Sequence, residues 1–114
     1  MIQIRTKTEG NVYYLAVDGE ADASSSIHLD KAINQAVKSG ARKILVNCSG
    51  MNYISSAGLG VFMSYIEEMN SEGIVMVIYG LNEKVKNVFQ ILGLDQLLKI
   101  VDSQDQAKEA VHEL

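Results

Sequence analysis

The chain has 114 residues, a formal net charge of −4 and a sequence pI near 5.0. That length suits one domain with its own core, and an acidic balance with scattered basic residues argues against nucleic-acid binding. Cys48 is the single cysteine, which excludes an internal disulfide and fits a reducing compartment. His28 and His112 have no cysteine or carboxylate at ligand spacing, so we expect no metal site.

The chain contains no apolar run long enough to span a membrane, and its N-terminus lacks the pattern of a secretion signal. We therefore expect a cytoplasmic protein without a membrane span.

The first half of the chain predicts a hairpin followed by a helix. Residues 2–7 alternate between apolar and polar side chains, and residues 12–17 do so less cleanly. An acidic turn at residues 18–22 then leads into a helix that ends at Gly40, a residue typical of helix C-termini. Asp22 stands where a helix N-terminus favours negative charge, so one interpretation of Asp22 is a helix cap.

Strands and helices alternate in the rest of the chain. Residues 43–47 predict a buried strand, and a helix follows from the Ser55–Ser56 junction to about Ser71, ended by Gly73. Residues 74–78 predict a second buried strand, and a shorter helix begins after Asn82. We expect a short edge strand over residues 97–101 and a last helix capped at 102–103.

This order predicts an α/β fold in a single domain spanning residues 1–114. We expect a mixed, mostly parallel sheet of four to five strands, flanked by about four helices, with the N-terminal β-hairpin adding an antiparallel strand. Functional loops of such sheets gather at the carboxyl ends of the strands. Asp22 and the pair Ser55 and Ser56 would be neighbours there if their strands pair in parallel.

Ser56 at the start of a helix is either a cap or a switch, because a helix N-terminus stabilises both a hydroxyl oxygen and a phosphate. The loop offers no histidine or other base to activate a serine for hydrolysis, so we expect no catalytic residue. It also lacks the lysine of a Walker-type phosphate loop.

The helix after Ser56 has one regular apolar face and one irregular strip. Its predicted core face consists of residues at three- and four-residue steps: Leu59, Phe62, Met63, Ile66 and Met69. Val61 and Tyr65 fall outside that face and would form an exposed apolar strip beside Gly58. Such a strip is a candidate partner site.

Two segments of the chain resemble the STAS domain of bacterial anti-sigma-factor antagonists. They are Asn52-Tyr-Ile-Ser-Ser-Ala-Gly-Leu-Gly-Val-Phe62 after an apolar strand, and Gly19-Glu-Ala-Asp22 at the end of an earlier strand. The later segment Val85-Lys-Asn-Val-Phe-Gln-Ile-Leu-Gly-Leu94 is also similar to the family. The resemblance covers nearly the whole chain.

The resemblance implies partner switching. In the family, the unphosphorylated antagonist binds an anti-sigma factor that is also a serine kinase, and phosphorylation releases it until a serine phosphatase resets it. The phosphoacceptor falls on Ser56 and the acidic residue of the first β–α turn on Asp22. The docking surface would comprise Asp22, Ser55, Gly58, Val61 and Tyr65, and no cofactor is implied.

One residue departs from the family pattern. Ser55 stands where the family commonly has Asp before the phosphoacceptor, which makes Ser55 an alternative acceptor. Two other functions stay open: a nucleotide-binding module that uses the same helix N-terminus, and a non-phosphorylated adaptor subunit of a larger assembly.

Overall fold

The computed structural model describes residues 2–112. A short 3-10 turn, η1, covers Leu94–Gln96. The strands and helices, in chain order, are β1 Gln3–Glu9, β2 Val12–Ala21, α1 Ser26–Lys38, β3 Lys43–Ile54, α2 Ser56–Ser64, α3 Ile66–Glu72, β4 Val75–Tyr79, α4 Glu83–Ile91, β5 Lys99–Val101 and α5 Gln104–His112.

The five strands form one sheet in the order β1-β2-β3-β4-β5. β1 and β2 pair antiparallel as the predicted hairpin, and β2, β3, β4 and β5 pair in parallel. The predicted mixed, mostly parallel sheet is therefore confirmed.

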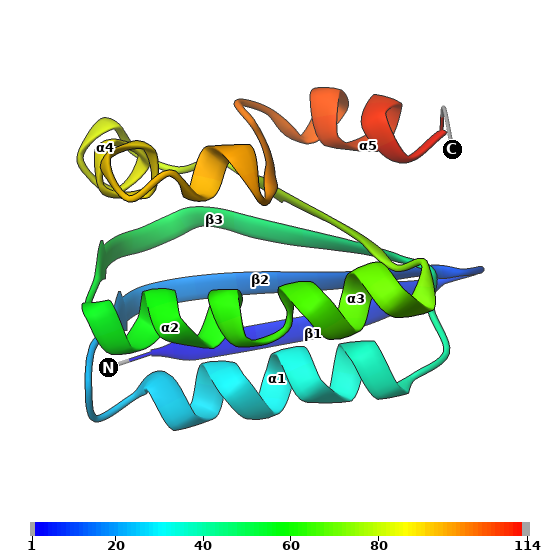
Figure 1. The fold of residues 1–114 in the computed structure, drawn as a ribbon, viewed down its shortest axis with the longest axis horizontal. Coiled ribbons are helices and arrows are strands. Elements are labelled where there is room, and N and C mark those ends of the chain that lie inside the picture. Colours follow the sequence, from blue (N-terminus) through cyan, green and yellow to red (C-terminus); the bar gives the residue numbers. More distant parts are fainter. Residues whose placement is uncertain (1, 113–114) are drawn as a thin grey trace.

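Helices cover the two faces of the sheet unequally. Alternate residues of β3 point to opposite faces, so Ile44 and Val46 join the larger hydrophobic cluster while Leu45 joins the smaller one. The larger cluster contains residues of α1, α2, α3 and α4, and the smaller one lies under α5. Figure 1 shows α2 and α3 end to end, with α1 alongside them on the same side of the sheet and α5 on the other side.

β2 and β3 are longer than the sequence pattern indicates. β2 continues through Ala21, so residues 18–21 of the acidic segment expected to be a turn are strand. β3 continues from Asn47 to Ile54. The two extensions pair with each other, with register shifts between Ala16 and Asp18 and between Gly19 and Glu20. These irregularities break the two-residue alternation by which strands are recognised.

The single helix expected from Ser56 to about Ser71 is two helices. α2 ends and α3 begins at Tyr65, which has φ −100° and ψ −6°, and whose backbone N–H is bonded to the carbonyls of Phe62 and Met63. The Tyr65 hydroxyl donates to the Asp30 carboxylate of α1 at 2.9 Å. This contact ties the break to the neighbouring helix.

Candidate functional site

The site lies where β2 and β3 end next to each other. Ala21 and Ile54 are partners in the parallel register, and the Ser55 backbone N–H donates to the Ala21 carbonyl at 2.8 Å. The loop that starts at Asp22 and the N-terminus of α2 are therefore adjacent. This confirms the expectation that the two loops would be neighbours.

The Asp22 carboxylate organises the loop between β2 and α1. Its Oδ1 accepts from the Ser24 N–H at 3.0 Å, the Ser24 hydroxyl at 2.8 Å and the Ser25 N–H at 2.9 Å. These bonds, the Ser24 hydroxyl foremost, lower the pKa of Asp22, so the carboxylate is ionised at neutral pH. Asp22 thus caps the turn before α1, whereas the N-cap residue itself is Ser25.

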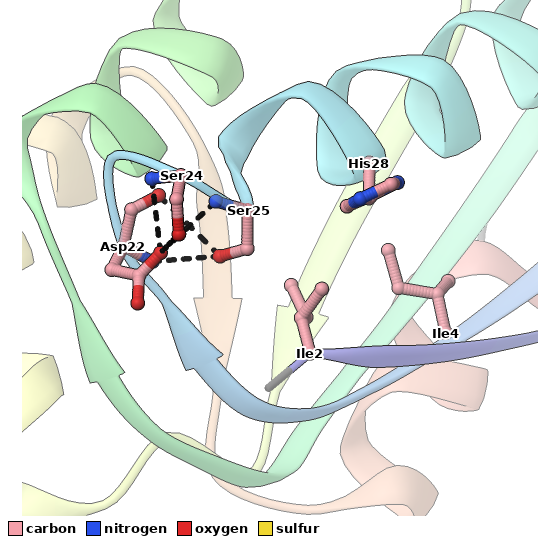
Figure 2. A pocket seen from close by; sticks show the side chains of 6 residues that line it. All are labelled: Ile2, Ile4, Asp22, Ser24, Ser25 and His28. Atoms are coloured by element: carbon pink, nitrogen blue, oxygen red, sulfur yellow. Dashed lines mark hydrogen bonds between the residues drawn. The ribbon is translucent and has the colours of Figure 1, made fainter.

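An open hollow of about 630 Å³ lies beside this loop. Figure 2 shows Ser24 and Ser25 turned toward Asp22, with His28 set apart from them on α1. The Ser24 hydroxyl donates to the Asp22 carboxylate. The Ser25 hydroxyl donates to the Glu20 carbonyl at 2.9 Å. His28 of α1, three residues after the N-cap residue Ser25, also lines this hollow. No hydrogen bond between described side chains joins it to either serine.

Ser55, not Ser56, caps α2. The Ser55 Oγ accepts from the Gly58 N–H at 3.2 Å and donates to the Ala21 carbonyl at 3.1 Å, so its hydroxyl is engaged on both sides. Of the two interpretations of Ser56, the cap is therefore wrong by one position, and the switch stays a prediction.

The Ser56 hydroxyl is exposed at the first helical position. The Ser56 Oγ makes no hydrogen bond to any described residue. Position 56 is thus the place at this end of α2 where a serine hydroxyl is both accessible and unengaged.

Replacing Ser55 with alanine is expected to lower the free energy of unfolding by about 1 kcal/mol, because the Gly58 N–H loses its cap. Ser56→Ala is expected to change it by less than about 0.5 kcal/mol, as exposed sites usually do. Urea denaturation of both variants measures the difference. Equal losses would contradict the assignment of the cap to Ser55.

The expectation that Val61 and Tyr65 form an exposed strip beside Gly58 is wrong. Gly58 is buried against Ala21 and Ile54, Val61 is half-buried, and Tyr65 is 9% exposed. α2 contacts α1 as well as the sheet, so its buried surface is wider than a single stripe. Whether these residues take part in docking stays a prediction.

Two other apolar side chains in this part of the chain are exposed. Met63, expected in the core, is 50% exposed, and Tyr53 near the end of β3 is 50% exposed. Tyr53 was missed, although strand alternation from the buried Ile54 would have placed it on the outer face. Tyr53 lies two residues before Ser55 and gives the site an accessible aromatic ring.

Among residues 2–112, no helix has the length and apolar content needed to cross a bilayer. In the same part of the chain, no three His, Cys, Asp or Glu side chains are grouped so that they could hold a metal ion.

Known proteins are similar to this chain in sequence or in fold. An anti-sigma-B factor antagonist of Staphylococcus aureus is 28% identical over 99 residues, which cover 87% of this chain and 92% of the relative. An anti-sigma factor antagonist from Mycobacterium paratuberculosis shares the fold with a TM-score of 0.90 at 20% identity, over 98% of this chain and 95% of that one. The Bacillus cell fate determinant SpoIIAA, in its phosphorylated form, matches with a TM-score of 0.74 at 19% identity, over 96% and 99% of the two chains.

The family model for the STAS domain matches residues 3–107. That span runs from the first strand into the last helix and includes both loops of the site. The chain therefore belongs to the STAS domain family.

Proposed function

We propose that this protein is an anti-sigma factor antagonist that binds an anti-sigma factor with serine kinase activity and is released when Ser56 is phosphorylated. The Staphylococcus aureus relative is named for the first part of this role. SpoIIAA, which has a similar fold, is known in a phosphorylated form. The role is regulatory and needs no catalytic residue in this chain.

The observation that carries the proposal is the contrast between the two serines. The Ser56 hydroxyl is exposed and unengaged in the described chain, whereas the Ser55 hydroxyl is bonded to the Ala21 carbonyl and the Gly58 N–H. A kinase acting on Ser55 would have to break the N-cap of α2 first. Ser56 is therefore the preferred acceptor and Ser55 the alternative.

The N-cap also accounts for serine in place of the aspartate common in the family. Aspartate and serine are both strongly preferred N-cap residues, since each offers a side-chain oxygen to an orphan N–H. Ser55 supplies that oxygen to Gly58. Serine at this position thus still supplies an N-cap, and Ser56 is the first residue of α2.

Phosphorylation would change the charge of this surface more than its shape. A phosphate adds about 1.5–2 negative charges at neutral pH. The positive end of the helix dipole favours that charge, so the phosphate would not destabilise the fold. The same charge would stand on the surface that contains the ionised Asp22 carboxylate. A partner that must desolvate both groups would be repelled.

The docking surface we propose keeps Asp22, Ser55 and Val61 and adds Tyr53. Tyr53 provides exposed apolar area next to the serines, and Val61 is half-buried on α2. Gly58 and Tyr65 are both buried, so they would contribute by fixing the position of α2.

The test is phosphosite mapping of the protein purified from its own host, with and without serine phosphatase treatment. We expect one phosphatase-sensitive phosphate on Ser56. Phosphate on Ser55 alone would keep the switch but contradict the assignment from the N-cap. Absence of phosphate under every growth condition would contradict partner switching and favour a non-phosphorylated adaptor.

A further inference from the structure

A second hollow lies on the opposite face of the sheet from the larger cluster and its helices. It has a volume of about 300 Å³, at the small end of the range for ligand pockets. α5 covers only part of this face, and its first residue, Gln104, forms one wall. The hollow is lined by Arg5, Thr6, Lys7, Tyr14, Leu15, Ala16, Asn47, Tyr79 and Gln104.

Two polar groups of this hollow are not used by the fold. Tyr79 is only 6% exposed, yet its hydroxyl makes no hydrogen bond to another described residue. No described side-chain oxygen or nitrogen is both fully enclosed and unpartnered, so the Tyr79 oxygen is not fully enclosed, and Tyr79 lines this hollow. The Asn47 Oδ1 accepts from the Ser49 N–H and hydroxyl, and the amide Nδ2 hydrogens have no acceptor among the described residues.

The Tyr79 hydroxyl is a donor at neutral pH. Burial, with a smaller effect of Tyr14, raises the pKa of Tyr79, so its proton is retained. Lys7 lines the same hollow, so its ammonium adds positive charge there. The buried end of the hollow therefore presents O–H and N–H donors with a cation close by.

The rim of the hollow carries two cations and an accessible ring. The Lys7 ammonium lies 5.0 Å from the centre of the half-buried Tyr14 ring. Arg5 pairs with Asp18 and Lys7 pairs with Glu9, each at 3.1 Å. Both pairs are exposed, and such pairs contribute little, so either cation can turn to a ligand. The N-terminal end of α5 adds positive partial charge at Gln104.

We propose that this hollow binds a small organic anion with a planar apolar body. The anionic group would be held by Lys7 and Arg5 with the Tyr79 hydroxyl as donor, and the planar body would lie against the Tyr14 ring. Each group of the hollow then has a matching part of the ligand. Carboxylates and phosphates share the required chemistry. The site is on the other face of the sheet from Ser56, so it is independent of the switch proposed above.

The test is a titration of the full chain with small ligands, monitored by proton–nitrogen correlation spectra. The probes are benzoate, phenyl phosphate and neutral benzyl alcohol, which separate a carboxylate ligand, a phosphate ligand and ring binding alone. We expect at least one anion to shift the amides of Lys7, Tyr14 and Tyr79 saturably, with a dissociation constant in about the millimolar range. Benzyl alcohol is expected to bind at least about tenfold more weakly.

Variants assign the contacts. Tyr79→Phe removes one oxygen and keeps the ring, and we expect it to weaken binding of the anion by about tenfold. Lys7→Gln, at an exposed position, is expected to weaken it as well, while Lys84→Gln on α4 removes an equal charge elsewhere and leaves affinity unchanged. Equal binding of benzyl alcohol, no saturable shift with either anion, or shifts confined to α2 would each overturn the proposal.

Discussion

Replacing Ser56 with aspartate is expected to weaken binding of the anti-sigma factor by roughly 100-fold or more while the chain stays folded. The new carboxylate would stand on the same surface as the ionised Asp22, and a partner covering both would desolvate two like charges. Such juxtapositions cost several kcal/mol, and each 1.4 kcal/mol is about tenfold in affinity. Isothermal titration calorimetry against the serine kinase that phosphorylates the purified chain measures the effect.

The same substitution is expected to be neutral or slightly stabilising for the fold. Position 56 is the first residue of α2, where a negative charge gains about 0.3–1 kcal/mol from the helix dipole. Loss of binding with an unchanged urea midpoint therefore separates charge repulsion from misfolding. Ser56→Ala should bind like the wild type. Ser71→Asp, at the far end of α3, controls for added charge, and equal affinity of Ser56→Asp and Ser71→Asp would contradict the proposed switch.

Two glycines in one turn of α2 are expected to respond to alanine with opposite signs. A Cβ on Gly58 would lie 2.9 Å from Ile54 Cγ1 and 3.0 Å from the Ala21 carbonyl oxygen. The carbonyl belongs to the end of β2 and is fixed by the Ser55 bonds, so it cannot move away cheaply. Gly58→Ala is therefore expected to lower the free energy of unfolding by about 1–3 kcal/mol.

Gly60 is the matched control because nothing lies within 4 Å of the Cβ it would gain. Alanine is favoured over glycine in a helix, so Gly60→Ala is expected to raise the free energy of unfolding by about 0.5–1 kcal/mol. Urea denaturation of the two variants should give midpoints on opposite sides of the wild type. Stabilisation by Gly58→Ala would show that α2 does not pack as closely on β2 as the structure places it.

The order of the elements could be predicted from the sequence because each carries its own local signal. The hairpin alternates, β4 is continuously apolar, and Asn82 and Ser103 cap the helices that follow them, with Asn82 Oδ1 accepting from the Val85 N–H at 2.8 Å. These signals depend on neighbouring residues alone. The parallel pairing of β2 and β3 also followed from that order.

The features that could not be predicted depend on contacts between distant parts of the chain. The extra length of β2 and β3 comes from their pairing through two irregularities, which hide the strand pattern. Tyr65 was expected to be exposed and Met63 to be buried, and the structure has the reverse. The sequence pattern was assigned to one buried stripe of a single helix, whereas the hydrogen bond to Asp30 of α1 holds Tyr65 inward. The cap falls on Ser55 because α2 begins at Ser56, one residue earlier than a cap at Ser56 would require.

The Ala21 carbonyl joins the two loops of the site, since it accepts both the Ser55 N–H at 2.8 Å and the Ser55 hydroxyl at 3.1 Å. This carbonyl sits at the end of a paired strand, so the spacing between the Asp22 loop and Ser56 is set by the backbone of the sheet. The loops cannot separate to relieve repulsion without breaking these bonds. A phosphate on Ser56 would therefore stand on a rigid surface. The partner would meet a surface whose charge has changed while its backbone geometry has not.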